Sequence, residues 1–105
     1  MKKTVALLSS MALALGAGLA QAAPEDAMNK AGCMACHAKD KKILGPAFKD
    51  IAAKYKGQDV TAKLIDKVRK GGAGTFGPIP MSPNGPDKIS DADLKDAIGW
   101  ILQQG

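Results

Sequence analysis

The C-terminal part of the chain carries its clearest helical pattern. Apolar residues recur there three or four positions apart, as on one face of an α-helix. This stripe consists of Leu94, Ala97, Ile98, Ile101 and Leu102. Ser90 precedes the stripe as a helix-capping residue, and Asp93 follows three positions later, as in a capping box. The pattern predicts a C-terminal helix that begins just after Ser90.

Two shorter helices are predicted in the middle of the chain, over residues 47–56 and 59–70. Their apolar faces consist of Phe48, Ile51, Ala52 and Tyr55 in the first segment, and of Val60, Leu64 and Val68 in the second. Gly57 follows the first segment and Gly71 the second. Glycine is common where helices end, so both segments have a defined stop.

A further helix is predicted over residues 24–35. Pro24 suits a first helical turn, and Glu25 and Asp26 complement the positive end of the helix dipole. The segment 71–86, in contrast, holds five glycines and four prolines and shows no periodicity, which predicts an irregular loop. No stretch alternates in the manner of a strand. The predicted fold class is all-α, with about four helices joined by long loops.

Residues 1–22 have the features of a bacterial secretory signal peptide. Two lysines near the start precede an apolar run over residues 5–19, and Ala20-Gln21-Ala22 is a typical cleavage site. An uncleaved membrane anchor is the alternative, but this run is shorter than the roughly 20 residues that span a bilayer. We therefore expect one domain of 83 residues, 23–105, in the periplasm.

The charge of this domain is modest. Without the two lysines of the signal peptide, 13 basic and 10 acidic residues remain, a net charge of +3. This value gives no support for nucleic-acid binding. A domain of this length buries only a small core, and small domains often depend on a metal or cofactor. Length therefore favours a domain built around a bound group.

Both cysteines and the only histidine of the chain lie in Cys33-Met34-Ala35-Cys36-His37. Cys-x-x-Cys-His is the attachment motif of c-type haem, in which the histidine is the proximal iron ligand. A thioredoxin-like dithiol would belong in a βαβ pattern, which the sequence does not predict. A structural zinc site needs four ligands, and this run offers three. The motif predicts one covalent haem c, attached through Cys33 and Cys36 and ligated by His37.

Met81 is the expected second axial ligand. No other histidine exists, which leaves methionine or lysine. Met34 lies between the two cysteines on the proximal side, and Met28 is expected to fill the core of the first helix. Met81 comes 44 residues after His37, between prolines that restrict the backbone. His/Met is the ligand pair of electron-carrying c-type haem proteins, and an ordinary loop methionine is the alternative.

Three more residues are candidates for supporting the haem. The carbonyl of Pro46 is expected to accept a hydrogen bond from the His37 ring, since a ligating histidine needs its other ring nitrogen fixed. Asn84 is expected to hydrogen-bond near the thioether or a haem propionate, or else to serve as a turn residue before Gly85. Trp100 is expected in the core, with a propionate contact through its indole N–H as the alternative.

With these residues in place, the chain resembles class I cytochromes c of the small bacterial cytochrome c-551 type. The resemblance covers residues 23–105. It rests on Gly-Cys-Met-Ala-Cys-His (32–37), Gly-Pro-Ala-Phe-Lys-Asp (45–50), Gly-Pro-Ile-Pro-Met-Ser-Pro-Asn (77–84) and Trp100. It implies about four helices around one His/Met-ligated haem. It also implies a periplasmic carrier that passes electrons from the quinol-oxidising chain to a terminal reductase, oxidase or peroxidase, in many members a nitrite reductase.

Two positions depart from the family pattern. A tryptophan usually precedes Gly-Pro-Ile-Pro-Met and donates to a propionate, whereas this chain has Phe76. An arginine often supports the same propionate, and Lys67 stands in its place. Because Phe76 has no donor, we expect propionate solvation to differ here, while the His/Met assignment is unaffected.

The expected function is electron transfer without catalysis. With both axial positions filled and no spare histidine, the chain lacks groups for peroxidatic acid–base chemistry. A haem enzyme or gas sensor with Met81 away from the iron is the alternative. A monomer is expected, meeting redox partners over a small surface at the haem edge, without stable membrane insertion. The residues expected around that edge are Lys30, Lys39, Lys41, Lys42, Ile79 and Pro80.

Overall fold

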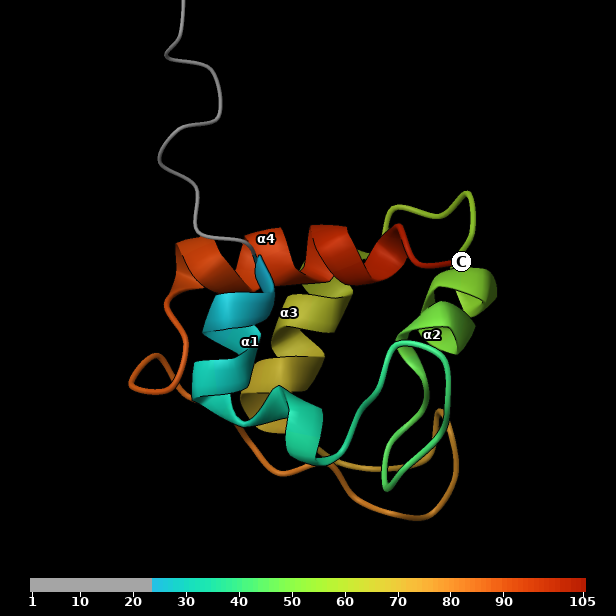
Figure 1. The fold of residues 1–105 in the computed structure, drawn as a ribbon, viewed down its shortest axis with the longest axis horizontal. Helices are drawn as coiled ribbons and strands as arrows, with labels where there is room; N and C mark the ends of the chain where they lie inside the picture. The colour runs from blue at the N-terminus through green and yellow to red at the C-terminus, as the bar shows by residue number, and fades with distance from the viewer. Residues whose placement is uncertain (1–23) are drawn as a thin grey trace, which may run out of the picture.

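The computed structural model describes residues 24–105, so the predicted signal peptide lies outside the described residues. Four α-helices and one 3₁₀ turn follow one another in this part of the chain, which contains no strand (Figure 1). They are α1 (Pro24–Ala31), η1 (Cys33–Ala35), α2 (Phe48–Lys54), α3 (Thr61–Lys70) and α4 (Asp91–Leu102). The predicted all-α class is confirmed.

The first helix is shorter than predicted. We expected it to reach residue 35, but α1 ends at Ala31. Gly32 takes a left-handed conformation with φ of 85°, which glycine adopts at little cost and which stops the helix. The cysteines therefore lie on a separate tight turn, in which the His37 amide donates to the Cys33 carbonyl over 3.0 Å.

The other helices agree with the sequence pattern to within two residues at each end. α2 and α3 begin one and two residues later than predicted, at Phe48 and Thr61. α4 begins directly after Ser90, whose hydroxyl accepts a hydrogen bond from the Asp93 amide over 3.2 Å. This is the predicted N-cap, which satisfies one of the free amides at the helix start.

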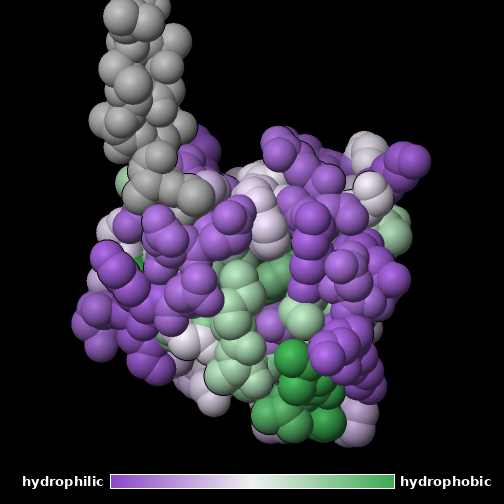
Figure 2. Space-filling view, in the orientation of Figure 1, coloured by the Kyte–Doolittle hydropathy of each residue, from purple (hydrophilic) through white to green (hydrophobic). Residues whose placement is uncertain are grey.

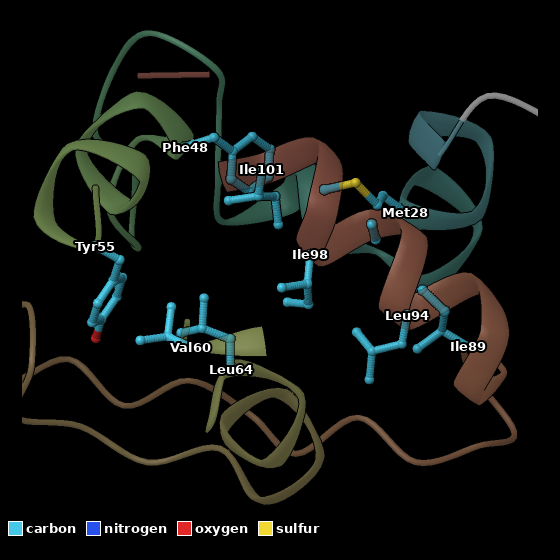
Figure 3. Close-up of a cluster of buried hydrophobic side chains, with 10 residues drawn as sticks. Met28, Phe48, Tyr55, Val60, Leu64, Ile89, Leu94, Ile98 and Ile101 are labelled. Atoms are coloured by element: carbon cyan, nitrogen blue, oxygen red, sulfur yellow. The ribbon is translucent and has the colours of Figure 1, made fainter. Parts of the chain in front are cut away.

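The core forms where α4 packs against α1, α2 and α3. Its buried residues are Met28, Phe48, Tyr55, Val60, Leu64, Ile89, Leu94, Ala97, Ile98 and Ile101. Figure 3 shows Leu94 and Ile98 of α4 directed toward the side of the core that holds Val60 and Leu64. The apolar stripe predicted for the last helix thus faces the core.

Long loops make up much of the remaining chain. The segment 71–86 runs from α3 back to the start of α4 along one end of the helices (Figure 1). Gly72 and Met81 pair across it, each amide donating to the other's carbonyl over 2.9 Å. Within residues 24–105, no helix has the length and apolar character needed to cross a membrane.

Candidate functional site

A cavity of about 320 Å³ lies between the helices and the long loops. Its volume falls within the range of about 300–1,000 Å³ that is usual for cofactor sites. Its walls are mostly apolar and come from all four helices, with Met28, Phe48, Leu64 and Leu94 as examples. A large apolar ligand is therefore the kind of group that the cavity suits.

Cys33, Cys36 and His37, the three haem-binding residues of the Cys-x-x-Cys-His motif, all line this cavity. The η1 turn brings Cys33 and Cys36 together, with the Cys36 amide donating to the Cys33 carbonyl over 3.2 Å. Burial raises the pKa of the Cys33 thiol, with a smaller contribution in the same direction from Cys36 and an opposing one from a backbone hydrogen bond. Catalytic dithiols have a lowered thiol pKa, so this environment does not favour the dithiol alternative.

The His37 ring is held from two sides. Its Nδ1 lies 2.8 Å from the Pro46 carbonyl oxygen, so the predicted contact is present. A carbonyl can only accept, so Nδ1 carries the proton and the lone pair of the neutral ring is on Nε2. Phe48 stacks on the imidazole with ring centroids 5.3 Å apart and an angle of 19° between the planes.

Gly45 packs against the same imidazole, a contact that no sequence pattern revealed. A Cβ atom built on Gly45 would lie 2.5 Å from Cε1 of His37, closer than such atoms approach in proteins. Glycine is therefore the residue that allows the loop backbone to lie against the ring. The Gly45-Pro46 bend thus shapes the histidine pocket with both of its residues.

Met81 reaches the cavity from the segment 71–86 and lines it together with His37. Met28 also lines the cavity, but it lies on α1 and is only 1% exposed, as a core methionine. Met34 packs against the core cluster. Two thiols, an imidazole and the Met81 thioether therefore line one cavity whose other walls are mostly apolar. This set of groups fits a c-type haem.

Asn84 and Trp100 lie outside the cavity lining. The Asn84 side-chain amide donates to the carbonyl of Ser82, two residues earlier, over 2.9 Å. Trp100 packs edge to face on Phe48, with ring centroids 5.6 Å apart and planes at 82°. Trp100 thus packs against the core, as expected, whereas Asn84 lies just before the turn at residues 86–88 and not within it. The propionate contacts considered for the two residues stay predictions.

Phe76 and Lys67, the two departures from the family pattern, both line the cavity. Phe76 is 37% exposed, and Nζ of Lys54 lies 5.7 Å from its ring centroid, within cation–π range. Among the residues that line the cavity, Lys67 is the only lysine, arginine or acidic residue. Lys67 is therefore the one cationic side chain that the cavity lining offers to a cofactor carboxylate.

Arg69 is a residue that the sequence motifs did not indicate. Its guanidinium donates to two main-chain carbonyls, those of Asn84 and Ile89, and pairs with the Asp91 carboxylate. Composition alone could have drawn attention to Arg69, because it is the only arginine among the 15 basic residues of the chain. Arginine is preferred over lysine where several acceptors must be bound at once.

Comparison with known proteins places the chain in a family. The family model for cytochrome c matches residues 17–105. Cytochrome c2 of Rubrivivax gelatinosus is 51% identical over 83 residues, which cover 78% of this chain and 98% of the relative. Cytochrome c-551 of Pseudomonas aeruginosa is 45% identical over 107 residues, covering 97% and 98%. The crystal structure of wild-type Nitrosomonas europaea cytochrome c552 matches with a TM-score of 0.69 and 44% identity, over 77% of this chain and 99% of that one.

These matches agree with the all-α fold. They also agree with the predicted cofactor, one covalent haem c. The chain thus belongs to the cytochrome c family, as a small class I member of the c-551 type that carries one haem c and transfers electrons.

Proposed function

We propose that this protein is a periplasmic, non-enzymatic electron carrier whose haem is attached through Cys33 and Cys36 and ligated by His37 and Met81. The observation that carries the proposal is the convergence of these four side chains on one apolar cavity. Bound haem supplies one-electron redox chemistry. The chain's own residues hold it, orient its ligands and limit the access of water.

His37 is prepared for ligation by its neighbours. The Pro46 carbonyl fixes the proton on Nδ1, so the lone pair on Nε2 is available to a metal. Phe48 and the close approach of Gly45 restrict rotation of the ring. A ligand held in this way needs little rearrangement when the iron changes its charge, which suits electron transfer.

Met81 is proposed as the distal ligand because its neutral thioether favours ferrous iron and raises the potential. If His37 and Met81 both hold the haem iron, no iron position would be open to a substrate. The chain has no second histidine that could act as a general acid or base. A small peroxidase or gas sensor, with Met81 away from the iron, is the competing function.

Export is the second part of the proposal. Residues 1–22 are proposed to be a signal peptide that is removed before Ala23, which leaves the domain in the periplasm. The proposed electron donor belongs to the quinol-oxidising respiratory chain. The proposed acceptor is a terminal reductase, such as a nitrite reductase, an oxidase or a peroxidase.

The proposed docking surface is the rim of the cavity. Leu44 and Ile79 line the cavity and remain 54% and 52% exposed. Figure 2 shows a hydrophobic area bordered by hydrophilic residues at the lower right of this face. Lys39, Lys41 and Lys42, on the loop that carries Leu44, are all exposed. An apolar contact with basic surroundings suits a weak complex with an acidic redox partner.

One experiment tests the assignment. The full chain is produced in a bacterium with a haem-attachment system, and the periplasmic protein is analysed by mass spectrometry and visible spectroscopy. We expect a polypeptide that begins at Ala23, haem that stays bound after denaturation, and the weak long-wavelength absorption of a thioether–iron bond in the ferric form. A high-spin ferric spectrum would overturn the carrier assignment, and haem lost on denaturation would overturn the attachment.

A further inference from the structure

Arg69 joins three parts of the chain through one guanidinium. Its Nη1 donates to the Asn84 carbonyl over 3.2 Å and to the Ile89 carbonyl over 2.8 Å. Its Nη2 lies 2.6 Å from a carboxylate oxygen of Asp91, the first residue of α4. The Arg69 side chain is only 17% exposed and its two bonds to main-chain carbonyls are partly buried, whereas the Asp91 carboxylate is 89% exposed.

These contacts fix the end of the segment that carries Met81. Asn84 comes three residues after Met81, and Ile89 lies just before α4. Main-chain bonds also tie this part of the loop to the end of α3. The Asn84 amide donates to the Val68 carbonyl over 2.9 Å, and Gly72 pairs with Met81. Arg69 adds a side-chain link beside the main-chain ones.

The loop has a particular need for such a link. Gly71, Gly72, Gly74 and Gly77 all have positive φ values, and this part of the segment forms no helix. Its main-chain hydrogen bonds are few, chiefly the Gly72–Met81 pair and the bond from Gly74 to Gly77. A glycine-rich segment gains much conformational freedom when it opens. Hydrogen bonds from a charged donor are stronger than neutral ones, and a partly buried site weakens them less than full exposure to water.

We propose that Arg69 is a positioning residue for Met81: it holds the loop so that the thioether stays at the cavity. This inference rests on the proposed ligation by Met81. Arg69 does not line the cavity, whereas Lys67 does, so Arg69 acts through the loop and not on the cofactor. Arginine suits this role because its planar fork reaches several acceptors, while a lysine ammonium is a single point of contact.

The test compares Arg69→Met with Lys70→Met in ferric holoprotein. Lys70 is the next residue of α3, and its exposed side chain pairs only with Asp66, one turn earlier. Both variants lose one positive charge at the same helix end. Cyanide binding measures how often Met81 leaves the iron, and the long-wavelength thioether band measures how much remains ligated. Arg69→Lys is the conservative variant.

We expect Arg69→Met to bind cyanide about tenfold more readily than the native protein and to lose part of the thioether band, since charged hydrogen bonds hold the closed loop. Lys70→Met should match the native protein, and Arg69→Lys should fall between native and Arg69→Met. If Arg69→Met does not fold, a tighter cyanide affinity in Arg69→Lys than in Lys70→Met still supports the proposal.

The positioning role is overturned if Arg69→Met and Arg69→Lys keep native cyanide binding and a native thioether band, even if their melting temperatures fall. A loss of stability alone would mean a purely structural role. Failure of the underlying ligation would look different, because the native protein itself would then lack the thioether band.

Discussion

Nδ1 of His37 lies 2.8 Å from the carbonyl oxygen of Pro46, nine residues further along the chain. The contact sets the tautomer of the ring and leaves Nε2 as its free nitrogen, which is the state that a metal ligand requires. Gly45 makes the contact possible, because its missing side chain lets the loop lie against the imidazole.

Gly45→Ala should displace the imidazole. The new Cβ would lie 2.5 Å from Cε1 of His37, and overpacking of this kind costs about 1–3 kcal/mol. We expect a lower free energy of unfolding and altered haem absorption in the holoprotein. Chemical denaturation followed by visible spectroscopy and circular dichroism measures both.

Gly99→Ala is the matched control for Gly45→Ala. Gly99 lies within α4, and a Cβ there would meet nothing within 4 Å. Alanine in a helix is favoured over glycine by about 1 kcal/mol, so this variant should be slightly more stable with an unchanged spectrum. Equal effects of the two substitutions would show that the packing against His37 is unimportant.

Met81→Ala should open the iron. Loss of the thioether should lower the reduction potential, remove the long-wavelength band and let cyanide or carbon monoxide bind readily. Ligand titrations and electrochemistry measure these changes. An unchanged low-spin spectrum with the original potential would mean that another residue is the ligand.

Met28→Leu serves as the control for methionine loss. Met28 is 1% exposed and packs in the core, so a substitution of similar volume should cost less than about 1.5 kcal/mol. The thioether band and the potential should stay as in the native protein. A lost band in this variant would move the ligand assignment from Met81 to Met28.

The domain should not fold without its cofactor. Core residues such as Phe48, Leu64, Leu94 and Ile98 line the cavity, so without haem they face a void where their packing partners should be. Short helices have little stability of their own in water. We expect a Cys33→Ala/Cys36→Ala protein free of haem to show low helicity by circular dichroism. A cooperative thermal transition with native-like helicity would contradict this expectation.

Lysines beside the haem edge should speed the meeting with an acidic partner. Replacing Lys39, Lys41 and Lys42 by glutamine should lower the second-order electron-transfer rate. The loss should shrink as salt is added, because exposed charges are screened over about 10 Å at 0.1 M ionic strength. The potential should hardly move. Stopped-flow kinetics at several salt concentrations measures the effect.

A variant that loses three positive charges away from the haem edge is the control for lysine steering. The control variant replaces three exposed lysines outside the loop 38–46, namely Lys56, Lys88 and Lys95. It should change the rate less than the first variant does. If the native rate is independent of salt, docking occurs through the apolar rim around Leu44 and Ile79 and not through lysine steering.

Much of this protein could be predicted from its sequence because local chemistry encodes it. Ser90 caps α4 and the apolar stripe of that helix faces the core, since spacing along a helix determines which residues share a face. The Cys-x-x-Cys-His motif is equally local and indicated the haem. The one clear error in the helices, at Gly32, arose because a single left-handed residue ends a helix that the flanking pattern would allow to continue.

Ligand chemistry predicted Met81 and Pro46 beside His37 from the sequence, but only the tertiary structure decided how the ring is packed. No pattern along the chain placed Gly45 and Phe48 against the imidazole. Arg69 shows the same limit, since its partners at Asn84, Ile89 and Asp91 lie 15 to 22 residues away. Such contacts depend on the path of a glycine- and proline-rich loop, and that path is determined by packing and hydrogen bonds between segments, which residue spacing along the chain does not contain.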